Sequence, residues 1–320
     1  MRILITAPYN EDGRKALADA FGEVIYKSWK IQNRAYNANE LLTLLAESKA
    51  DALITEHDEV TEEVINAFPD LKFIGVCRGT PSNVAVNVAE KKGIPVFHTP
   101  ARNAQAVAEM FVANVITFMR KTLPAMEWLK EGQWNNGAHT SYLEFKGNEL
   151  AGKKIGMVGF GAVGQTIARL VDNFPCSIIY YDPYYTSENT NYEKAEINTV
   201  FSEADIVAIN LPVTEQTKGL INKELISLMK PEAIFVNYSR AVVVKREDLL
   251  EALESKRIRG AIIDVFDHEP PDEIDNKIIH RPNVLATPHI AGATFEVEDH
   301  HVNIMNDKLM KWLESVRVQN

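Results

Sequence analysis

The stretch that decides the fold is residues 155–170, which read IGMVGFGAVGQTIARL. An apolar run typical of a strand passes directly into a turn with three glycines, and a helix-forming run follows. Gly159 permits a tight turn, Gly161 lets a pyrophosphate approach the backbone, and Gly164 allows the helix to pack closely on the strand. This order of strand, glycine turn and helix predicts a dinucleotide-binding unit, with the phosphates at the helix N-terminus.

A carboxylate follows the glycine turn at the distance typical of dinucleotide binding. The next apolar run ends at Asp182, about 20 residues further along the chain, where it could accept hydrogen bonds from both adenosine ribose hydroxyls. The same carboxylate would repel a 2′-phosphate, and residues 183–185 contain no arginine, so NAD is the predicted cofactor rather than NADP. The alternative interpretation is a structural glycine turn followed by a surface aspartate.

Composition excludes several other classes of protein. The 320 residues are 46% hydrophobic and 24% charged, which indicates a globular protein long enough for two domains. A formal net charge of -10 disfavours binding to nucleic acid or to anionic lipid. The start of the chain does not resemble a signal peptide and no apolar run is long enough to span a membrane, so a cytoplasmic location is expected. Cys77 and Cys176 lack a partner motif, and no metal site is expected.

Two series of short β-branched runs alternate with helical segments, which predicts parallel α/β sheets. The first series occupies the N-terminal hundred residues, and the second begins at Lys154. Asn103 is expected to cap a long crossover helix that ends before Pro124, and a helical segment at 295–313 is expected to return to the first domain. The expected fold is therefore α/β with two domains and the active site in the cleft between them. A flavodoxin-like substrate-binding domain comprises residues 1–100 and 290–320, and a Rossmann-type NAD-binding domain comprises residues 101–289.

Three polar residues of the second series follow predicted strands, at the edge where open parallel sheets place their ligands. Arg240 could bind the carboxylate and carbonyl oxygen of a 2-keto acid in a planar fork. His289 could donate a proton in reduction and accept one in oxidation, and Glu269 could orient the imidazole and keep its proton available. Alternative interpretations are a surface arginine that caps the next helix, an exposed histidine and a solvated turn.

Six ordered segments carry a resemblance to a known family: VGFGAVG at 158–164, LPVT at 211–214, LMKP at 228–231, NYSR at 237–240, DVFDHEP at 264–270 and TPHIAG at 287–292. Over nearly its whole length the chain resembles the D-isomer-specific 2-hydroxyacid dehydrogenase family, in the short, phosphoglycerate dehydrogenase-like form without an appended regulatory domain. The resemblance implies Arg240, Glu269 and His289 as the catalytic triad. Two departures are Ala241, where the family often has glycine, and Ala85, where many members have aspartate.

The resemblance also implies further contacts. Asp264 would meet the nicotinamide carboxamide, with a strand-end cap as the alternative, and the loop at Arg78 and Gly79 would cradle the substrate carboxylate with its amides. A homodimer through the NAD domain is expected, with Ala104, Ala106 and Ala108 permitting close approach, although core packing explains these alanines equally well. The full set of expected cofactor contacts is Gly159, Gly161, Ala162, Val163, Gly164, Asp182, Leu211, Pro212, Thr217, Tyr238, Ser239, Asp264 and His289.

The expected function is NAD-dependent, reversible hydride transfer between NADH and a small 2-keto acid. The alternative is an NAD(H)-sensing binding protein of the corepressor type on the same fold, and a formate-type enzyme would be expected to carry glutamine at position 269. Glyoxylate, hydroxypyruvate and 3-phosphoglycerate stay open as substrates, because Arg78 and Arg102 could bind a second anionic group or form surface salt bridges. The direction of the reaction in the cell stays open as well.

Overall fold

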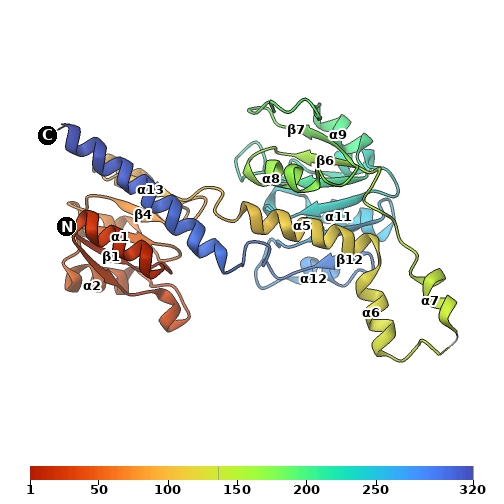
Figure 1. Ribbon diagram of the computed structural model, residues 1–320, viewed down its shortest axis with the longest axis horizontal. Helices are drawn as coiled ribbons and strands as arrows, with labels where there is room; N and C mark the ends of the chain where they lie inside the picture. The colour runs from red at the N-terminus through yellow and green to blue at the C-terminus, as the bar shows by residue number, and fades with distance from the viewer. Residues whose placement is uncertain (136, 320) are drawn as a thin grey trace. The chain divides into compact units, whose positions relative to one another are not determined.

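A computed structural model describes residues 1–135 and 137–319 and divides the chain into two compact units. The first unit comprises Met1–Asn103 and Ala293–Asn320, and the second comprises Ala104–Gly292 (Figure 1). Both units are built on parallel sheets covered by helices, as the alternating sequence pattern predicts. Among the described residues, no helix is both long and apolar enough to cross a membrane.

The first unit contains a five-stranded parallel sheet in the order β2-β1-β3-β4-β5. Its strands are β1 (Arg2–Ile5), β2 (Glu23–Tyr26), β3 (Ala52–Thr55), β4 (Ile74–Val76) and β5 (Val96–His98). Its helices are α1 (Glu11–Phe21), η1 (Trp29–Gln32), α2 (Ala38–Ser48), α3 (Glu62–Ala67), α4 (Val86–Lys91) and α13 (Glu296–Gln319). The sequence did not predict β2, because this edge strand is only half-buried and lacks a clear apolar pattern.

The C-terminal helix α13 completes the core of the first unit. It packs against α1 and β5, and its apolar side chains Val302, Met305 and Leu309 are buried beside Ile3 and Ile5 of β1. The helix runs to Gln319, beyond the end at residue 313 that the sequence indicated. The chain therefore leaves the first unit once and returns to it.

The second unit contains a seven-stranded parallel sheet in the order β12-β11-β10-β9-β6-β7-β8. Its strands are β6 (Lys154–Val158), β7 (Ser177–Tyr181), β8 (Tyr192–Lys194), β9 (Ile206–Ile209), β10 (Ile234–Asn237), β11 (Gly260–Ile263) and β12 (Val284–Ala286). Its helices are α5 (Ala104–Met119), α6 (Thr122–Lys130), α7 (Ala138–Glu144), α8 (Ala162–Val171), α9 (Ile197–Glu203), α10 (Lys223–Leu228), η2 (Ala241–Val243), α11 (Arg246–Glu254) and α12 (Glu273–Ile279). The strand order reverses between β6 and β9, and open α/β sheets bind ligands at the carboxyl ends of strands beside such a reversal.

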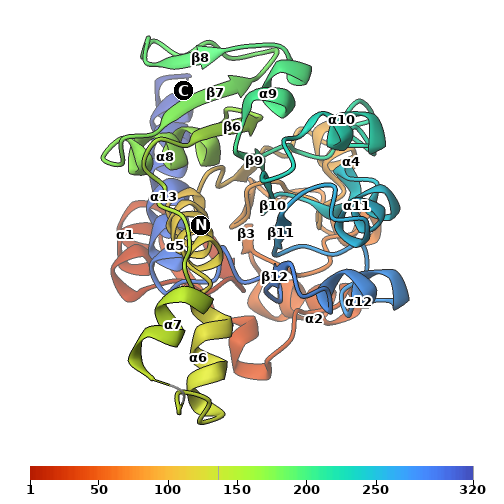
Figure 2. The same cartoon turned by 90° about the vertical axis from the view of Figure 1, so that its right-hand side faces the viewer.

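Both faces of this sheet are covered, which explains its continuous apolar strands. On β9, Ile206 and Ala208 join the core beneath α5 and α8, whereas Val207 and Ile209 join the opposite core beneath α9, α10 and α11. Figure 2 shows α5 and α8 on one side of the strands and α10 and α11 on the other. The short edge strand β8 escaped sequence prediction for the same reason as β2, since it exposes two of its three residues.

Helix α5 follows Asn103 directly and ends at Met119, and Pro124 falls in the first turn of α6. Ala104, Ala106 and Ala108 are buried within the chain, and α5 packs against α8. Core packing therefore accounts for these alanines. Their part in a dimer contact stays a prediction.

Candidate active site

The glycine turn between β6 and α8 has the backbone geometry that its sequence predicts. Gly159 adopts a φ of 91°, and a Cβ there would lie 2.6 Å from the carbonyl oxygen of Asn210. A Cβ on Gly164 would lie 2.8 Å from the Gly159 carbonyl oxygen, so this glycine allows the helix to pack on the turn. Gly161 faces open space and is the N-cap of α8 without a side-chain hydrogen bond, which leaves amides of the first turn open to a phosphate. Ala162 and Val163 supply the first residues of that helix.

Asp182 follows β7 and is hydrogen-bonded to the glycine turn itself. Its Oδ2 accepts from the Phe160 amide at 2.8 Å, and its Oδ1 accepts from the Tyr184 and Tyr185 amides at 2.9 and 3.0 Å. A carboxylate offers about four acceptor positions, so one remains, on Oδ2. One acceptor position on this carboxylate is therefore open to a ribose hydroxyl, and contact with both hydroxyls stays a prediction.

Glu269 and His289 meet at the carboxyl edge of the same sheet. Imidazole Nδ1 lies 2.8 Å from Glu269 Oε1 and 2.9 Å from Oε2. Because a carboxylate only accepts, Nδ1 carries a proton, and Nε2 is the ring nitrogen left to exchange one with a substrate. The His289 side chain is 49% exposed and the Glu269 side chain 44%, so both can be reached from solvent.

His289 adopts a φ of 54°, which costs a residue with a side chain roughly 1–2 kcal/mol. Asp264, at the end of β11 and 1% exposed, holds the loop in this conformation. Its Oδ1 accepts from the Thr287 hydroxyl at 2.6 Å and the Ile290 amide at 2.9 Å, and its Oδ2 accepts from the Ala291 amide at 2.8 Å. Asp264 is thus the strand-end cap of the alternative interpretation, and one acceptor position on Oδ2 remains for a cofactor amide.

Arg240 follows β10, which pairs with β11, the strand that precedes Glu269; β12, which precedes His289, lies on the other side of β11. Asn237 shapes its loop, because the amide side chain accepts from the Ser239 amide and hydroxyl and donates to the Arg240 carbonyl. The guanidinium donates to the Ser239 carbonyl at 2.7 Å, and its side chain faces solvent. Ala241 lies outside the left-handed region, so its Cβ imposes no backbone strain on this loop.

The remaining residues that are expected to contact the cofactor differ in burial and in hydrogen bonding. Leu211 is buried and lies against the glycine turn, and the Pro212 carbonyl accepts the Thr217 hydroxyl at 2.6 Å in an exposed turn. Tyr238 is a core residue: its hydroxyl accepts a hydrogen bond from Asn114 of α5 at 2.6 Å, and burial raises its pKa. The Tyr238 side chain therefore serves packing, and a cofactor contact of this residue stays a prediction.

In the first unit, Arg78 and Gly79 form a turn after β4. The Thr99 amide donates to the Arg78 carbonyl at 2.8 Å, and the Gly79 carbonyl lies 2.8 Å from His98 Nδ1. A Cβ on Gly79 would meet nothing within 4 Å, so its backbone is open to a ligand. Ala85 occupies the N-cap position of α4 and makes no side-chain cap, so an aspartate at this position could cap the helix.

Arg102 is committed to a buried cluster. Its Nη1 donates to Glu56 Oε1 at 2.6 Å and lies 3.0 Å from His301 Nδ1. Glu56 is 5% exposed and also accepts from the Trp29 indole at 3.1 Å. The hypothesis that Arg102 binds a second anionic group of the substrate is therefore not supported, because its charge already compensates a buried carboxylate.

Sequence reasoning missed the residues that shape the two loops. Asn237 belongs to the NYSR segment, but the segment did not reveal the loop-shaping role of this side chain, and Arg246 gave no signal beyond being a polar residue at a helix start. The hydrogen bonds to Asp264 link residues 23 to 27 positions apart. Only the folded sheet brings these groups together.

The family model described as "D-isomer specific 2-hydroxyacid dehydrogenase, NAD binding domain" matches residues 112–291. The chain is 60% identical over 312 residues to "Putative 2-hydroxyacid dehydrogenase YoaD" of Bacillus subtilis (strain 168), which covers 98% of this chain and 91% of that protein. It is 36% identical over 262 residues to the hydroxypyruvate reductase of Thermotoga maritima, with 81% and 83% covered.

Solved structures agree with the sequence relatives. An acyclic imino acid reductase, Bsp5, in complex with NADPH and D-Arg, superposes with a TM-score of 0.82 at 25% identity and covers 98% of each chain. The model match and the sequence identities extend over more than half of this chain, including the glycine turn and the loops of Arg240, Glu269 and His289. The chain therefore belongs to the D-isomer specific 2-hydroxyacid dehydrogenase family, whose members are oxidoreductases that act on CH–OH groups with a nicotinamide cofactor.

Proposed function

We propose that the protein is an NAD-dependent D-2-hydroxyacid dehydrogenase in which Arg240, Glu269 and His289 carry the chemistry. The observation that carries the proposal is the contact between Glu269 and His289 Nδ1 at 2.8 Å, which leaves Nε2 for proton exchange. The pair lies at the same sheet edge as the open glycine turn. That edge is where parallel sheets bind dinucleotides.

In the reducing direction the chain has two tasks, because the bound nicotinamide supplies the hydride that reaches C2 of the keto acid. Arg240 binds the substrate carboxylate and polarises the carbonyl. His289 Nε2 delivers a proton to the carbonyl oxygen as negative charge develops there, and Glu269 stabilises the imidazolium before the transfer. In oxidation the same imidazole accepts the hydroxyl proton.

The carboxylate at position 182 favours NAD over NADP. Asp182 is fixed beside the glycine turn, and a 2′-phosphate there would meet a carboxylate that already accepts from Phe160. The Bsp5 structure contains NADPH, so this preference needs a direct test. We expect a lower dissociation constant for NADH than for NADPH. Asp182→Asn is expected to bring the two dissociation constants closer together.

Small, unphosphorylated 2-keto acids are the proposed substrates. Hydroxypyruvate reductase is the name of one relative and glyoxylate reductase that of another. In the first unit the backbone of Gly79 is open, and Arg102 is engaged with Glu56 and is not available for a second anionic group. We therefore expect glyoxylate and hydroxypyruvate to be reduced faster than 3-phosphohydroxypyruvate.

The test is NADH oxidation by wild type and His289→Ala with pyruvate, glyoxylate, hydroxypyruvate and 3-phosphohydroxypyruvate. Loss of a general acid is expected to lower kcat by about 10²–10⁴-fold. NADH binding should stay unchanged in the variant. NADH binding by wild type without turnover on any of these acids would contradict the proposal and favour a nicotinamide-sensing role.

We also propose a homodimer formed through the second unit, with its contact on α6 and α7. These helices extend from the body of the unit (Figure 1), and they expose Leu123, Met126, Leu129, Tyr142 and Leu143 by 49–73%. Such a set of exposed apolar side chains is typical of a protein interface. Light scattering should give the mass of two chains for wild type, and the double variant Leu129→Glu, Leu143→Glu should shift the mass toward that of one chain.

The cytoplasmic location stays a prediction, to be tested by cell fractionation.

A further inference from the structure

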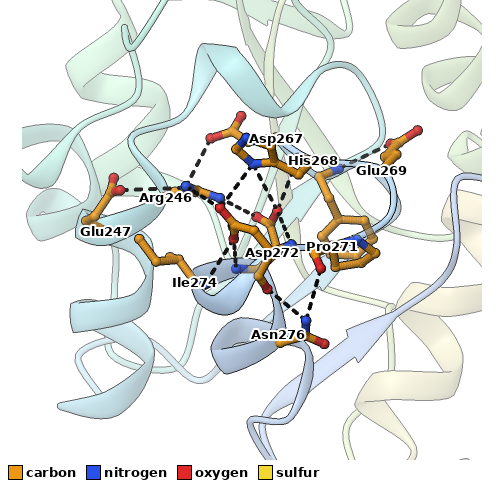
Figure 3. A network of polar contacts seen from close by, with 11 residues as sticks. Arg246, Glu247, Asp267, His268, Glu269, Pro271, Asp272, Ile274 and Asn276 are labelled. Atoms are coloured by element: carbon orange, nitrogen blue, oxygen red, sulfur yellow. Dashed lines mark hydrogen bonds and ion pairs between the residues drawn. The ribbon is translucent and has the colours of Figure 1, made fainter.

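A single guanidinium contacts the loop that carries Glu269 on both sides of that residue. Arg246 opens α11, and its Nε lies 3.2 Å from Asp267 Oδ2 while its Nη2 lies 2.9 Å from Asp272 Oδ2. Figure 3 shows Arg246 between these carboxylates, with Glu269 on the loop that joins them. The side chain therefore ties together the two ends of residues 267–272.

A buried carboxylate extends this contact to the loop backbone. Asp275 Oδ1 lies 3.0 Å from Arg246 Nη1, and its side chain is 3% exposed. Its Oδ2 accepts from the His268 amide at 3.1 Å and from the Asp272 amide at 3.4 Å. A buried carboxylate needs a compensating charge, and Arg246 supplies it. The hydrogen bond from Arg246 lowers the pKa of Asp272 to about 2.

Glu269 itself has few contacts that fix it. It accepts from the Phe266 amide at 3.4 Å and meets His289 Nδ1, and its side chain is 44% exposed. Its position relative to the imidazole therefore depends on the backbone of residues 267–272. Since the structure shows Arg246 on the two ends of that loop, any effect of Arg246 on Glu269 passes through the loop.

The loop and the first turn of α12 together contain a histidine and two aspartates whose ligand atoms lie within 4.8 Å of one another, namely His268, Asp272 and Asp275. A divalent cation would have to compete with a guanidinium that already binds both carboxylates. The arrangement is therefore an ion-pair network centred on Arg246.

We propose that Arg246 is a positioning residue, which holds loop 267–272 so that Glu269 meets the imidazole of His289. This inference rests on the proposed function of that pair. Misplacement of a catalytic group by about 1 Å can lower a rate by about 100-fold. Loss of the Arg246 contacts should therefore act on kcat through Glu269, and NADH binding at the glycine turn should not change.

The test is a double-mutant cycle between Arg246→Gln and Glu269→Gln, with kcat, KM and the pH profile of kcat measured for keto acid reduction. Arg246→Gln is expected to lower kcat by about 10–100-fold and to displace the pH profile in the same direction as Glu269→Gln. In the Glu269→Gln background the same substitution should change kcat by less than about 2-fold, because coupled residues are not additive. Arg246→Lys should recover part of the loss, since lysine keeps the charge and lacks the planar fork.

Arg281→Gln is the matched control, because it removes an ion pair of α11, with Glu254 at 3.2 Å, without touching the loop. It should leave kcat and the pH profile as in wild type. If Arg246→Gln does not fold, Asp267→Asn removes one contact of the guanidinium, keeps the others and should give the same pattern at smaller size.

The outcomes separate the two proposals. Wild-type turnover with an unchanged pH profile in Arg246→Gln and Asp267→Asn would overturn the positioning role alone. Equal losses from Arg246→Gln with and without Glu269 would show a general structural effect and would overturn it as well. Absence of wild-type turnover on every keto acid would overturn the proposed function together with this inference.

Discussion

Asp264 offers a test of how the His289 loop is held. Its buried carboxylate accepts hydrogen bonds from Thr287, Ile290 and Ala291 around a histidine with a φ of 54°. Asp264→Asn keeps one acceptor oxygen and places an amide NH2 against a backbone N–H. Hydrogen bonds to a charged group contribute about 1.5–3 kcal/mol each and neutral ones about 1 kcal/mol. The substitution loses one of these charged hydrogen bonds and makes the other two neutral, so it should lower the free energy of unfolding by at least about 2.5 kcal/mol.

The assay is urea unfolding without cofactor, followed by circular dichroism, together with NADH turnover. We expect the stability loss in the absence of NADH and a drop in kcat of about 10–100-fold, because the His289 loop loses its fixed conformation. Asp172→Asn is the control, since that exposed carboxylate accepts only at the surface, from Tyr192, and should change stability by less than about 0.5 kcal/mol. A variant as stable as wild type that binds NADH weakly would refute the loop-holding role and favour a direct contact with nicotinamide.

Three further outcomes follow from contacts described above. Gly161→Ala should lower the free energy of unfolding by no more than about 1 kcal/mol, since its Cβ meets nothing within 4 Å and only the N-cap preference is lost, yet weaken NADH binding by at least about 10-fold in fluorescence titration. Burial lowers the pKa of His301, so the unfolded chain takes up a proton that the folded chain refuses, and stability should fall as pH drops below about 6.5. Comparing wild type with His301→Gln in urea at about pH 8 and about pH 5.5 should show a shallower decline in the variant, and equal declines would contradict the assignment. Tyr238→Phe should cost about 1 kcal/mol through loss of the Asn114 contact and leave kcat unchanged, whereas a large loss of turnover would indicate a cofactor role for the hydroxyl.

The part of the site that could be predicted was local in sequence. The glycine turn at 159–164 combines strand, turn and helix signals within one short stretch. Gly159 and Gly164 meet steric requirements that neighbouring atoms impose, whereas Gly161 faces open space. The order of elements likewise indicated parallel α/β sheets, because continuous apolar runs such as β9 are typical of strands buried on both faces. Short edge strands were missed because they are half-exposed and have no such run.

The sequence by itself thus determined the family, the α/β class and the residue types available at the strand ends, since these depend on local chemistry and periodicity. Tertiary structure decided which of those residues have a free side chain. Arg102 is bound to buried Glu56, and Tyr238 belongs to the core beneath α5. Asp264 accepts three hydrogen bonds from the His289 loop. These assignments depend on which strands lie side by side and on which polar groups are buried away from water. Contacts between residues far apart in the chain leave no periodic pattern from which they could be predicted.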